Sequence, residues 1–459
     1  MKTLLRGGSV VSGRGTARLD VLLEGERIAA VGENLPAGDA QAVDCAGRLL
    51  FPGFIDAHTH FDLEVAGTIT ADDFASGSRA ALRGGTTTVI DFAAPDKGES
   101  LASGLARWRR KAEGRCACDY GFHMTIDDWN EDVSREVGEM MDQGLTSFKM
   151  YMTYPAMMLP EGDMFRALVR LREAGGLVGV HCENHGVIQA LTAQARAEGR
   201  LSPASHPRTR PAELEAEAVG SLLRLAQVAD VPVVIVHLTS RAALEEVRAA
   251  RKRGQRVYAE TCPQYLLLEA GRYDHPEYAE AAKYVCAPPL RRQEDQEALW
   301  AALRDGEIDT VATDHCSFTT AQKRAGQYDF TKIPGGLPGV EHRGLLLYSA
   351  GVAAGRITAA DMCRVLCENP ARLYGCWPRK GTIAPGGDGD IVVIDPTAEG
   401  VIRAADQLQR ADYTPYEGMA VRGAVERVYL RGRLAAERGA VYPGEGVFLA
   451  RGRSEDYRR

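Results

Sequence analysis

The sequence predicts an α/β protein, a (β/α)8 barrel of the TIM type with a small β-sandwich domain built from both termini. Two observations favour this architecture. Eight apolar runs alternate with helical segments in the middle of the chain, and strand fragments separated by glycine-rich turns occupy both ends. Parallel strands buried on both faces read as continuous apolar runs, each followed by a helix. We expect the sandwich domain to comprise residues 1–50 and 378–459, and the barrel residues 51–377.

The strand fragments at the two ends have the same texture. They lie at residues 9–11, 21–23, 27–31, 390–395, 423–429 and 439–442. Short strands bounded by glycine turns are typical of a sandwich.

The eight apolar runs of the central region are the predicted barrel strands. They lie at residues 53–58, 86–92, 120–126, 146–152, 177–182, 232–238, 256–262 and 309–314. Segments rich in Ala, Leu, Glu and Arg, such as 212–227 and 242–253, separate them as helices. A doubly wound open sheet is the alternative, but neither GxGxxG nor a phosphate-binding loop follows the first run. The barrel is therefore favoured.

Composition narrows the class of protein. The net charge of -7 gives no reason to expect nucleic acid or an anionic membrane as a partner. The longest apolar stretch, near residues 231–238, is too short to span a membrane, and the N-terminus lacks the apolar core of a signal peptide. Ten cysteines without a CxxC pair do not indicate a disulfide framework, and we expect Cys116, Cys118, Cys363 and Cys367 to be reduced and buried. We predict a cytoplasmic protein.

Candidate metal ligands follow the predicted strands at the rim where such barrels carry their active sites. His58 and His60 are two residues apart, so they share one strand face. Taken alone the pair could be solvated or core histidines. The ends of later strands supply the remaining candidates, Lys149, His181, His237 and Asp314. Their convergence on one rim predicts a metal site.

Lys149 is flanked by Phe148 and Met150 within an apolar strand. A lysine that snorkels to the rim is the alternative interpretation. Burial would lower the pKa of the ammonium and free the amine, which could then take up carbon dioxide as a carbamate. A carbamate is an anionic oxygen ligand that can bridge two metals.

The other histidines have a structural interpretation. We expect this for His315, His123 and His185, which lack matching ligands. The remaining three lie in polar segments and are predicted to be solvated: His206, His275 and His342.

The candidate residues stand within six short motifs: His58-Thr-His60-Phe-Asp, Ser147-Phe-Lys149-Met-Tyr-Met-Thr-Tyr154, Val180-His181-Cys-Glu-Asn, Val236-His237-Leu-Thr, Glu260-Thr-Cys-Pro-Gln-Tyr and Ala312-Thr-Asp314-His-Cys. Together these motifs resemble the hydantoinase/dihydropyrimidinase family of the amidohydrolase superfamily, over essentially the whole chain.

The resemblance implies a binuclear site, with zinc as the expected metal. His58, His60 and Asp314 would hold one ion, His181 and His237 the other, and N6-carboxylated Lys149 would bridge both. It also implies that Tyr154 contacts the substrate carbonyl, that Asp314 transfers the proton, and that the product is an N-carbamoyl amino acid. Family members are commonly tetramers, so a homotetramer, or a homodimer, is expected.

Two positions depart from the family pattern. Ala287 stands where the family often has serine, and Gly335 where it often has asparagine. In the family these positions bind the cyclic imide through main-chain groups, so both remain candidate substrate contacts.

Loop residues after the first and fourth strands are expected to form an apolar pocket for the ring substituent: Leu63, Val65, Tyr151, Met157, Met158 and Leu159. Packing within the loops is the alternative. Dihydroorotases and allantoinases often carry an arginine where this chain has Asp62, so those activities rank behind. A non-catalytic scaffold is the alternative from another class, and the complete ligand set argues against it.

Overall fold

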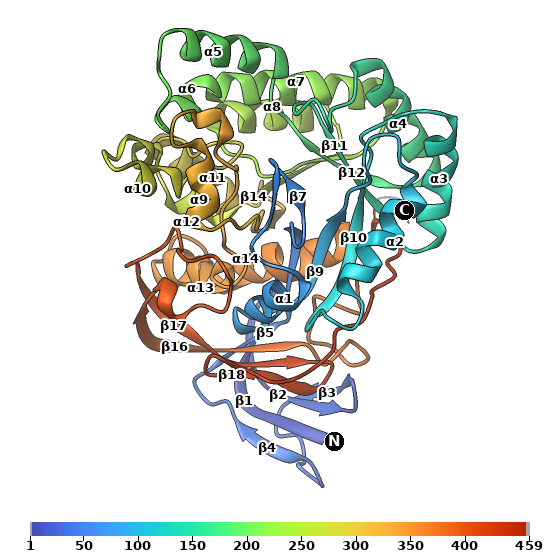
Figure 1. The fold of residues 1–459 in the computed structure, drawn as a ribbon. Helices are drawn as coiled ribbons and strands as arrows, with labels where there is room; N and C mark the ends of the chain where they lie inside the picture. The colour runs from blue at the N-terminus through green and yellow to red at the C-terminus, as the bar shows by residue number, and fades with distance from the viewer. Residues whose placement is uncertain (1, 456–459) are drawn as a thin grey trace.

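The computed structural model describes residues 2–455 (Figure 1), and its central element is a parallel barrel. Its strands follow the order β15-β14-β13-β12-β11-β10-β9-β6, each hydrogen-bonded to the next. All eight predicted runs are confirmed as strands. They are β6 (Phe54–Thr59), β9 (Thr86–Ala93), β10 (Asp119–Thr125), β11 (Ser147–Tyr151), β12 (Leu177–His181), β13 (Val233–Ile235), β14 (Val257–Thr261) and β15 (Thr310–Val311).

The first and last strands meet, so the sheet closes instead of staying open. His315, just beyond β15, forms a parallel bridge with Thr59, and its carbonyl accepts from His60 N at 2.8 Å. Below this contact the buried guanidinium of Arg343 donates to the carbonyls of Ile55 and Val311, both at 2.8 Å. Closure excludes the doubly wound alternative.

Helices follow the strands and cover the outside of the barrel (Figure 1). Several start at a polar side chain that accepts from a main-chain N–H of the first turn, as Asp73, Ser100, Asn130 and Ser240 do. The longer helices are α1 (Phe74–Arg83), α2 (Leu101–Ala112), α3 (Glu131–Asp142), α4 (Glu161–Ala174), α5 (His185–Ala197), α7 (Ala212–Ala229), α8 (Arg241–Lys252) and α11 (Gln293–Arg304).

Shorter elements lie in the loops above the barrel and after its last strand. They are the hairpin β7 (Glu64–Val65) and β8 (Thr68–Ile69), and the helices α6 (Ser205–Thr209), α9 (Pro263–Leu267), α10 (Tyr278–Ala282), α12 (Thr320–Lys323), α13 (Arg343–Leu347), α14 (Ala359–Cys363) and α15 (Asn369–Leu373).

Strands from both ends of the chain lie side by side at one end of the molecule (Figure 1), as predicted. They form a single mixed sheet in the order β19-β18-β17-β16-β5-β1-β2-β3, with β4 on β1. The strands are β1 (Lys2–Ser12), β2 (Gly15–Glu24), β3 (Arg27–Gly32), β4 (Gln41–Asp44), β5 (Leu49–Pro52), β16 (Ile391–Val401), β17 (Ala420–Leu430), β18 (Arg433–Glu437) and β19 (Ala440–Val441). The domain boundaries at 50/51 and 377/378 remain a prediction.

After β19 the chain returns to the barrel and runs along the N-terminal ends of its strands. Leu449 N donates to Tyr120 O at 2.7 Å, and Arg451 N to Gly144 O at 3.0 Å. The Arg451 guanidinium is buried there and donates to Ser147 Oγ at 2.8 Å. This segment therefore covers the face of the barrel opposite the candidate site.

Two expectations from composition can be compared with the structure. The ten cysteines are all free and buried, including the four for which this was predicted. Within residues 2–455, no helix combines the length and the apolar character needed to cross a membrane.

Candidate metal centre and active site

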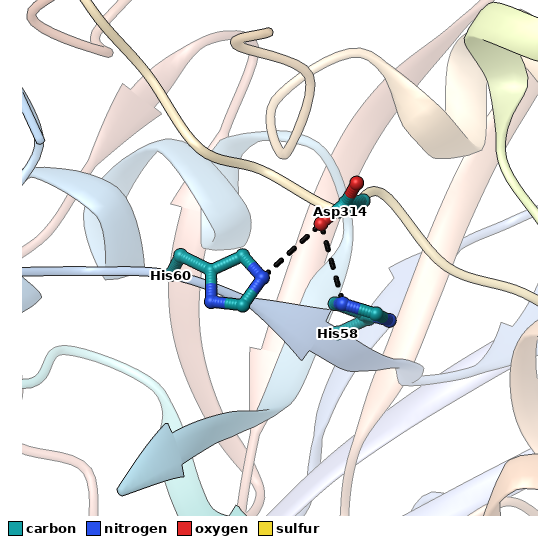
Figure 2. Close-up of side chains that lie close together, drawn as sticks. All are labelled: His58, His60 and Asp314. Carbon is teal, nitrogen blue, oxygen red and sulfur yellow. Dashed lines mark hydrogen bonds and ion pairs between the residues drawn. The ribbon is translucent and has the colours of Figure 1, made fainter. Parts of the chain in front are cut away.

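His58, His60 and Asp314 form one compact group of potential ligands at the C-terminal rim (Figure 2). Asp314 Oδ1 lies 3.2 Å from His58 Nε2 and 3.1 Å from His60 Nε2. Burial opposes ionisation of Asp314, but the two rings hold the pKa of this carboxyl well below its usual range. Two imidazoles and a carboxylate are a donor set that suits zinc and similar divalent ions.

The surroundings of His58 fit a metal ligand. Its Nδ1 is 2.7 Å from Glu260 Oε1, which fixes the ring orientation and directs Nε2 into the site. His58 Nε2 is buried, and its contact with Asp314 Oδ1 at 3.2 Å does not have hydrogen-bond geometry, so among residues 2–455 no hydrogen bond satisfies it. A buried nitrogen without a partner is costly, and coordination to a cation would satisfy it.

Lys149, His181 and His237 form a second group beside the first. The His181 and His237 rings are 4.6 Å apart between centroids, and His58 lies 5.5 Å from His237. His181 Nε2 is held by Glu183 Oε2 at 2.7 Å. The six candidate ligands thus lie together, as their positions at strand ends predict.

Lys149 is the most unusual member of this group. It is 1% exposed, and its Nζ lies 5.1 Å from the ring centroids of both Phe92 and Tyr151. Within the described part of the chain, no carboxylate lies within ion-pair distance of it. Burial lowers the pKa of this ammonium to about 8. The neutral fraction near neutral pH is therefore larger than that of an exposed lysine, which favours reaction of the amine with carbon dioxide.

Backbone geometry at the rim is strained at three candidate residues. Tyr154, His237 and Asp314 have φ values of 69°, 38° and 51°, in a region that non-glycine residues rarely adopt. Such conformations cost about 1–3 kcal/mol each and persist where the surroundings enforce them. These three are among nine non-glycine residues with positive φ in the described part of the chain, and at each the backbone conformation sets the direction of a candidate side chain.

Tyr154 lies above the second group. Its ring centroid is 5.2 Å from that of His181, and the Arg210 guanidinium lies over the tyrosine at 5.6 Å. Arg210 Nη1 also donates to Glu183 Oε2 at 2.6 Å. Arg210 and Glu183 therefore connect the orientation of Tyr154 to that of His181.

The candidate ring-binding positions Ala287 and Gly335 lie on two loops that face each other. A methyl group placed on Gly335 would be 4.0 Å from Ala287 N. Within residues 2–455, the N–H groups of both residues lack a hydrogen-bond partner. Free main-chain groups on opposed loops suit a planar ring with its own donors and acceptors.

A cavity of about 900 Å³ opens between the loops that follow β6, β9, β10 and β11. Leu63, Val65 and Met157 line it, whereas the buried Tyr151 and the half-buried Met158 pair with each other and do not. The lining is also less apolar than expected, because six charged residues contribute to it: Glu64, Asp96, Lys97, Arg107, Lys111 and Asp127. The cavity can therefore hold polar as well as apolar substituents.

The Asp62 side chain has a structural role at the start of α1 and not a ligand-binding one. Its Oδ2 accepts from Phe74 N at 3.2 Å, at the start of α1. Because the carboxylate is used in this contact, it gives no information about the charge of the substrate. The absence of an arginine at this position still does.

Three functional neighbours were not assigned a role from the sequence: Glu260, Glu183 and Arg210. Glu260 and Glu183 do stand in the quoted motifs, at or just beyond strand ends. A histidine that binds a metal through one ring nitrogen usually has its other nitrogen hydrogen-bonded to a neighbour, often a carboxylate. A search for such carboxylates could have identified Glu260 and Glu183.

Two histidine predictions are wrong. His206 and His342 are buried, at 8% and 7% exposure, although their sequence neighbours are polar. His275 is exposed, as predicted. Both nitrogens of His123 are hydrogen-bonded, to Ser147 Oγ and Ala57 O, in agreement with a structural role. His315 likewise contacts Asp72 Oδ2 at 3.1 Å.

Burial of His206 predicts a pH effect on stability. Desolvation lowers the pKa of its imidazole to about 3, and Nε2 contacts Cys286 O at 2.7 Å. Below about pH 6.5 the imidazole of the unfolded chain takes up a proton, whereas that of the folded chain does not. The free energy of unfolding therefore falls on acidification below that pH, by up to about 1.4 kcal/mol per pH unit.

His206→Gln keeps a donor but cannot titrate. We expect its free energy of unfolding, from urea denaturation, to fall less between about pH 7 and 5 than that of the parent. All other titrating groups are shared, so equal slopes in the two proteins would contradict the prediction.

Known proteins resemble this chain over nearly its whole length. The sequence model of the protein family described as the amidohydrolase family matches residues 49–435 of this chain. A D-hydantoinase from Streptomyces coelicolor is 45% identical over 438 residues, which cover 94% of this chain and 93% of that protein. A D-phenylhydantoinase from Escherichia coli is 41% identical, covering 98% of each. The crystal structure of dihydropyrimidinase from Brevibacillus agri has a TM-score of 0.97 at 42% identity, covering 99% of both chains.

Proposed function

Because this chain belongs to the amidohydrolase family, we propose that it hydrolyses cyclic amides, opening 5-substituted hydantoins and dihydropyrimidines to N-carbamoyl amino acids. The observation that carries the proposal is the cluster of His58, His60 and Asp314 on one barrel rim with His181, His237 and Lys149 beside it, in a chain 41–45% identical to named hydantoinases. Those relatives' names also favour the D enantiomer as substrate.

The donor set suits two divalent ions, with zinc the expected metal. His58, His60 and Asp314 would hold one, and His181 and His237 the other. Lys149, carboxylated on Nζ, would supply an oxygen to each. When bound, the ions would lower the pKa of a water molecule at the site and so supply the nucleophile.

The protein's own groups would do the rest of the chemistry. Asp314 Oδ, which the flanking histidines keep ionised, would take a proton from the attacking water and deliver it to the departing ring nitrogen. The Tyr154 hydroxyl would donate a hydrogen bond to the oxyanion as the carbonyl carbon becomes tetrahedral. Free N–H groups at Ala287 and Gly335 would orient the ring. No covalent intermediate with the protein is needed.

The cavity beside the site would receive the ring substituent. Leu63, Val65 and Met157 provide an apolar wall for aryl or alkyl groups. Because this chain has Asp62 where dihydroorotases and allantoinases often have an arginine, we place hydantoins and dihydropyrimidines ahead of allantoin and dihydroorotate.

A metal and substrate assay tests the proposal. We expect at least one zinc per chain, and a kcat/KM for D-phenylhydantoin or dihydrouracil above that for allantoin and dihydroorotate. Chelation should abolish turnover, and zinc should restore it. Less than about one metal per chain, with no ring opened, would instead support the scaffold alternative.

Location and assembly are also part of the proposal. We expect a homotetramer in the cytoplasm, where the ten buried thiols would remain reduced. Light scattering on the purified protein measures the assembly directly.

A further inference from the structure

Lys323, at the end of α12, is a buried lysine outside the candidate metal centre. It is 2% exposed, and its ammonium donates to three carbonyls: Val285 O at 2.7 Å, Pro334 O at 2.8 Å and Gly336 O at 2.9 Å. An ammonium has three donors, so all are used. No carboxylate in the described part of the chain lies within ion-pair distance of it.

Burying a cation without a carboxylate is expensive. This free-energy cost is reflected in the pKa of Lys323, which burial lowers to about 7. An apolar side chain would fill the same space without that penalty, so packing alone does not account for a lysine here. The three carbonyls instead suggest that the ammonium organises main chain.

The carbonyls belong to the two loops that carry Ala287 and Gly335. Val285 lies two residues before Ala287, while Pro334 and Gly336 flank Gly335 on either side. Gly336 N donates to Val285 O at 3.0 Å, so the lysine reinforces a direct contact between the loops. The N–H groups of Ala287 and Gly335 themselves stay free.

We infer that Lys323 is a positioning residue that clamps these two loops at the spacing at which their free main-chain groups receive the substrate ring. This inference rests on the proposed function, since it concerns how the ring is held. Lys323 acts through the loops and does not touch the reacting atoms.

Lys323→Met tests the clamp, because it fills a similar volume and donates no hydrogen bond. We expect KM for D-phenylhydantoin and dihydrouracil to rise about tenfold or more, with a smaller change in kcat, since misplaced binding groups act on ring affinity. Metal content should stay at the parent value, because Lys323 contacts none of the candidate ligands. The matched control is Lys332→Met, an exposed lysine nine residues later.

A purely structural lysine would lower the melting temperature and the active fraction while leaving KM unchanged. Lys323→Gln, whose amide can still donate two of the three bonds, should give an intermediate KM, and it carries the test if the methionine variant does not fold. An active parent with KM unchanged within about twofold in both variants overturns the inference alone. A parent that opens no ring overturns the proposed function instead.

Discussion

Lys149→Ala is expected to lose both bound metal and ring opening, with kcat lowered by at least about 10⁴-fold. Once carboxylated, this side chain would, on the proposal above, offer an oxygen to both groups of ligands. Its removal also leaves an apolar gap beside Phe92 and Tyr151, which cannot replace a ligand. Metal per chain by plasma mass spectrometry and hydrolysis of D-phenylhydantoin measure the two losses.

Two further measurements sharpen this result. Lys252→Ala removes an exposed lysine at the end of α8 and should keep full metal and activity. Acetate or propionate could occupy the space left by the Lys149 side chain, so we expect either to restore part of the activity. Retained activity in Lys149→Ala without added carboxylate would rule out a bridging role.

Asp314→Asn is expected to lower kcat by about 10²–10⁴-fold, the range for losing a general acid–base. The amide preserves the size of the side chain but accepts no proton, and it offers a weaker oxygen to a cation. KM should change less, because we propose that the loops around Ala287 and Gly335 hold the ring.

The control for this variant is Asp142→Asn, at the exposed end of α3. Metal analysis separates the two roles of Asp314. If Asp314→Asn keeps its metal and its kcat is unchanged, another group must transfer the proton.

Strand-end residues explain why much of this site was predictable. His58, His60, Lys149, His181, His237 and Asp314 are defined by a simple rule, because parallel strands present their C-terminal ends on one rim. Eight apolar runs were enough to define that rim. The rule depends only on local pattern and topology, and both are carried by the sequence.

Contacts that depend on tertiary packing were not predictable in this way. His206 has polar sequence neighbours, yet a loop covers it, and only the folded chain shows that Cys286 O accepts from it. Nothing in the sequence around Glu260 indicates that its carboxylate contacts His58, which only the folded structure shows. Strand pairing was equally hidden: β5 joins β1 to β16 in one sheet, and nothing local specifies partners more than 300 residues apart.

The segment beneath the barrel has a consequence for the order in which the protein is made. Arg451 donates hydrogen bonds to Ser147 Oγ and to the carbonyl of Gly144. The contacts below the N-terminal end of β11 can therefore form only after residue 451 has left the ribosome. Lys149 lies on that same strand. Until residues 449–451 have docked, β11 and the Lys149 that it carries lack these contacts, so we expect the candidate metal centre to form only after that segment has folded onto the barrel.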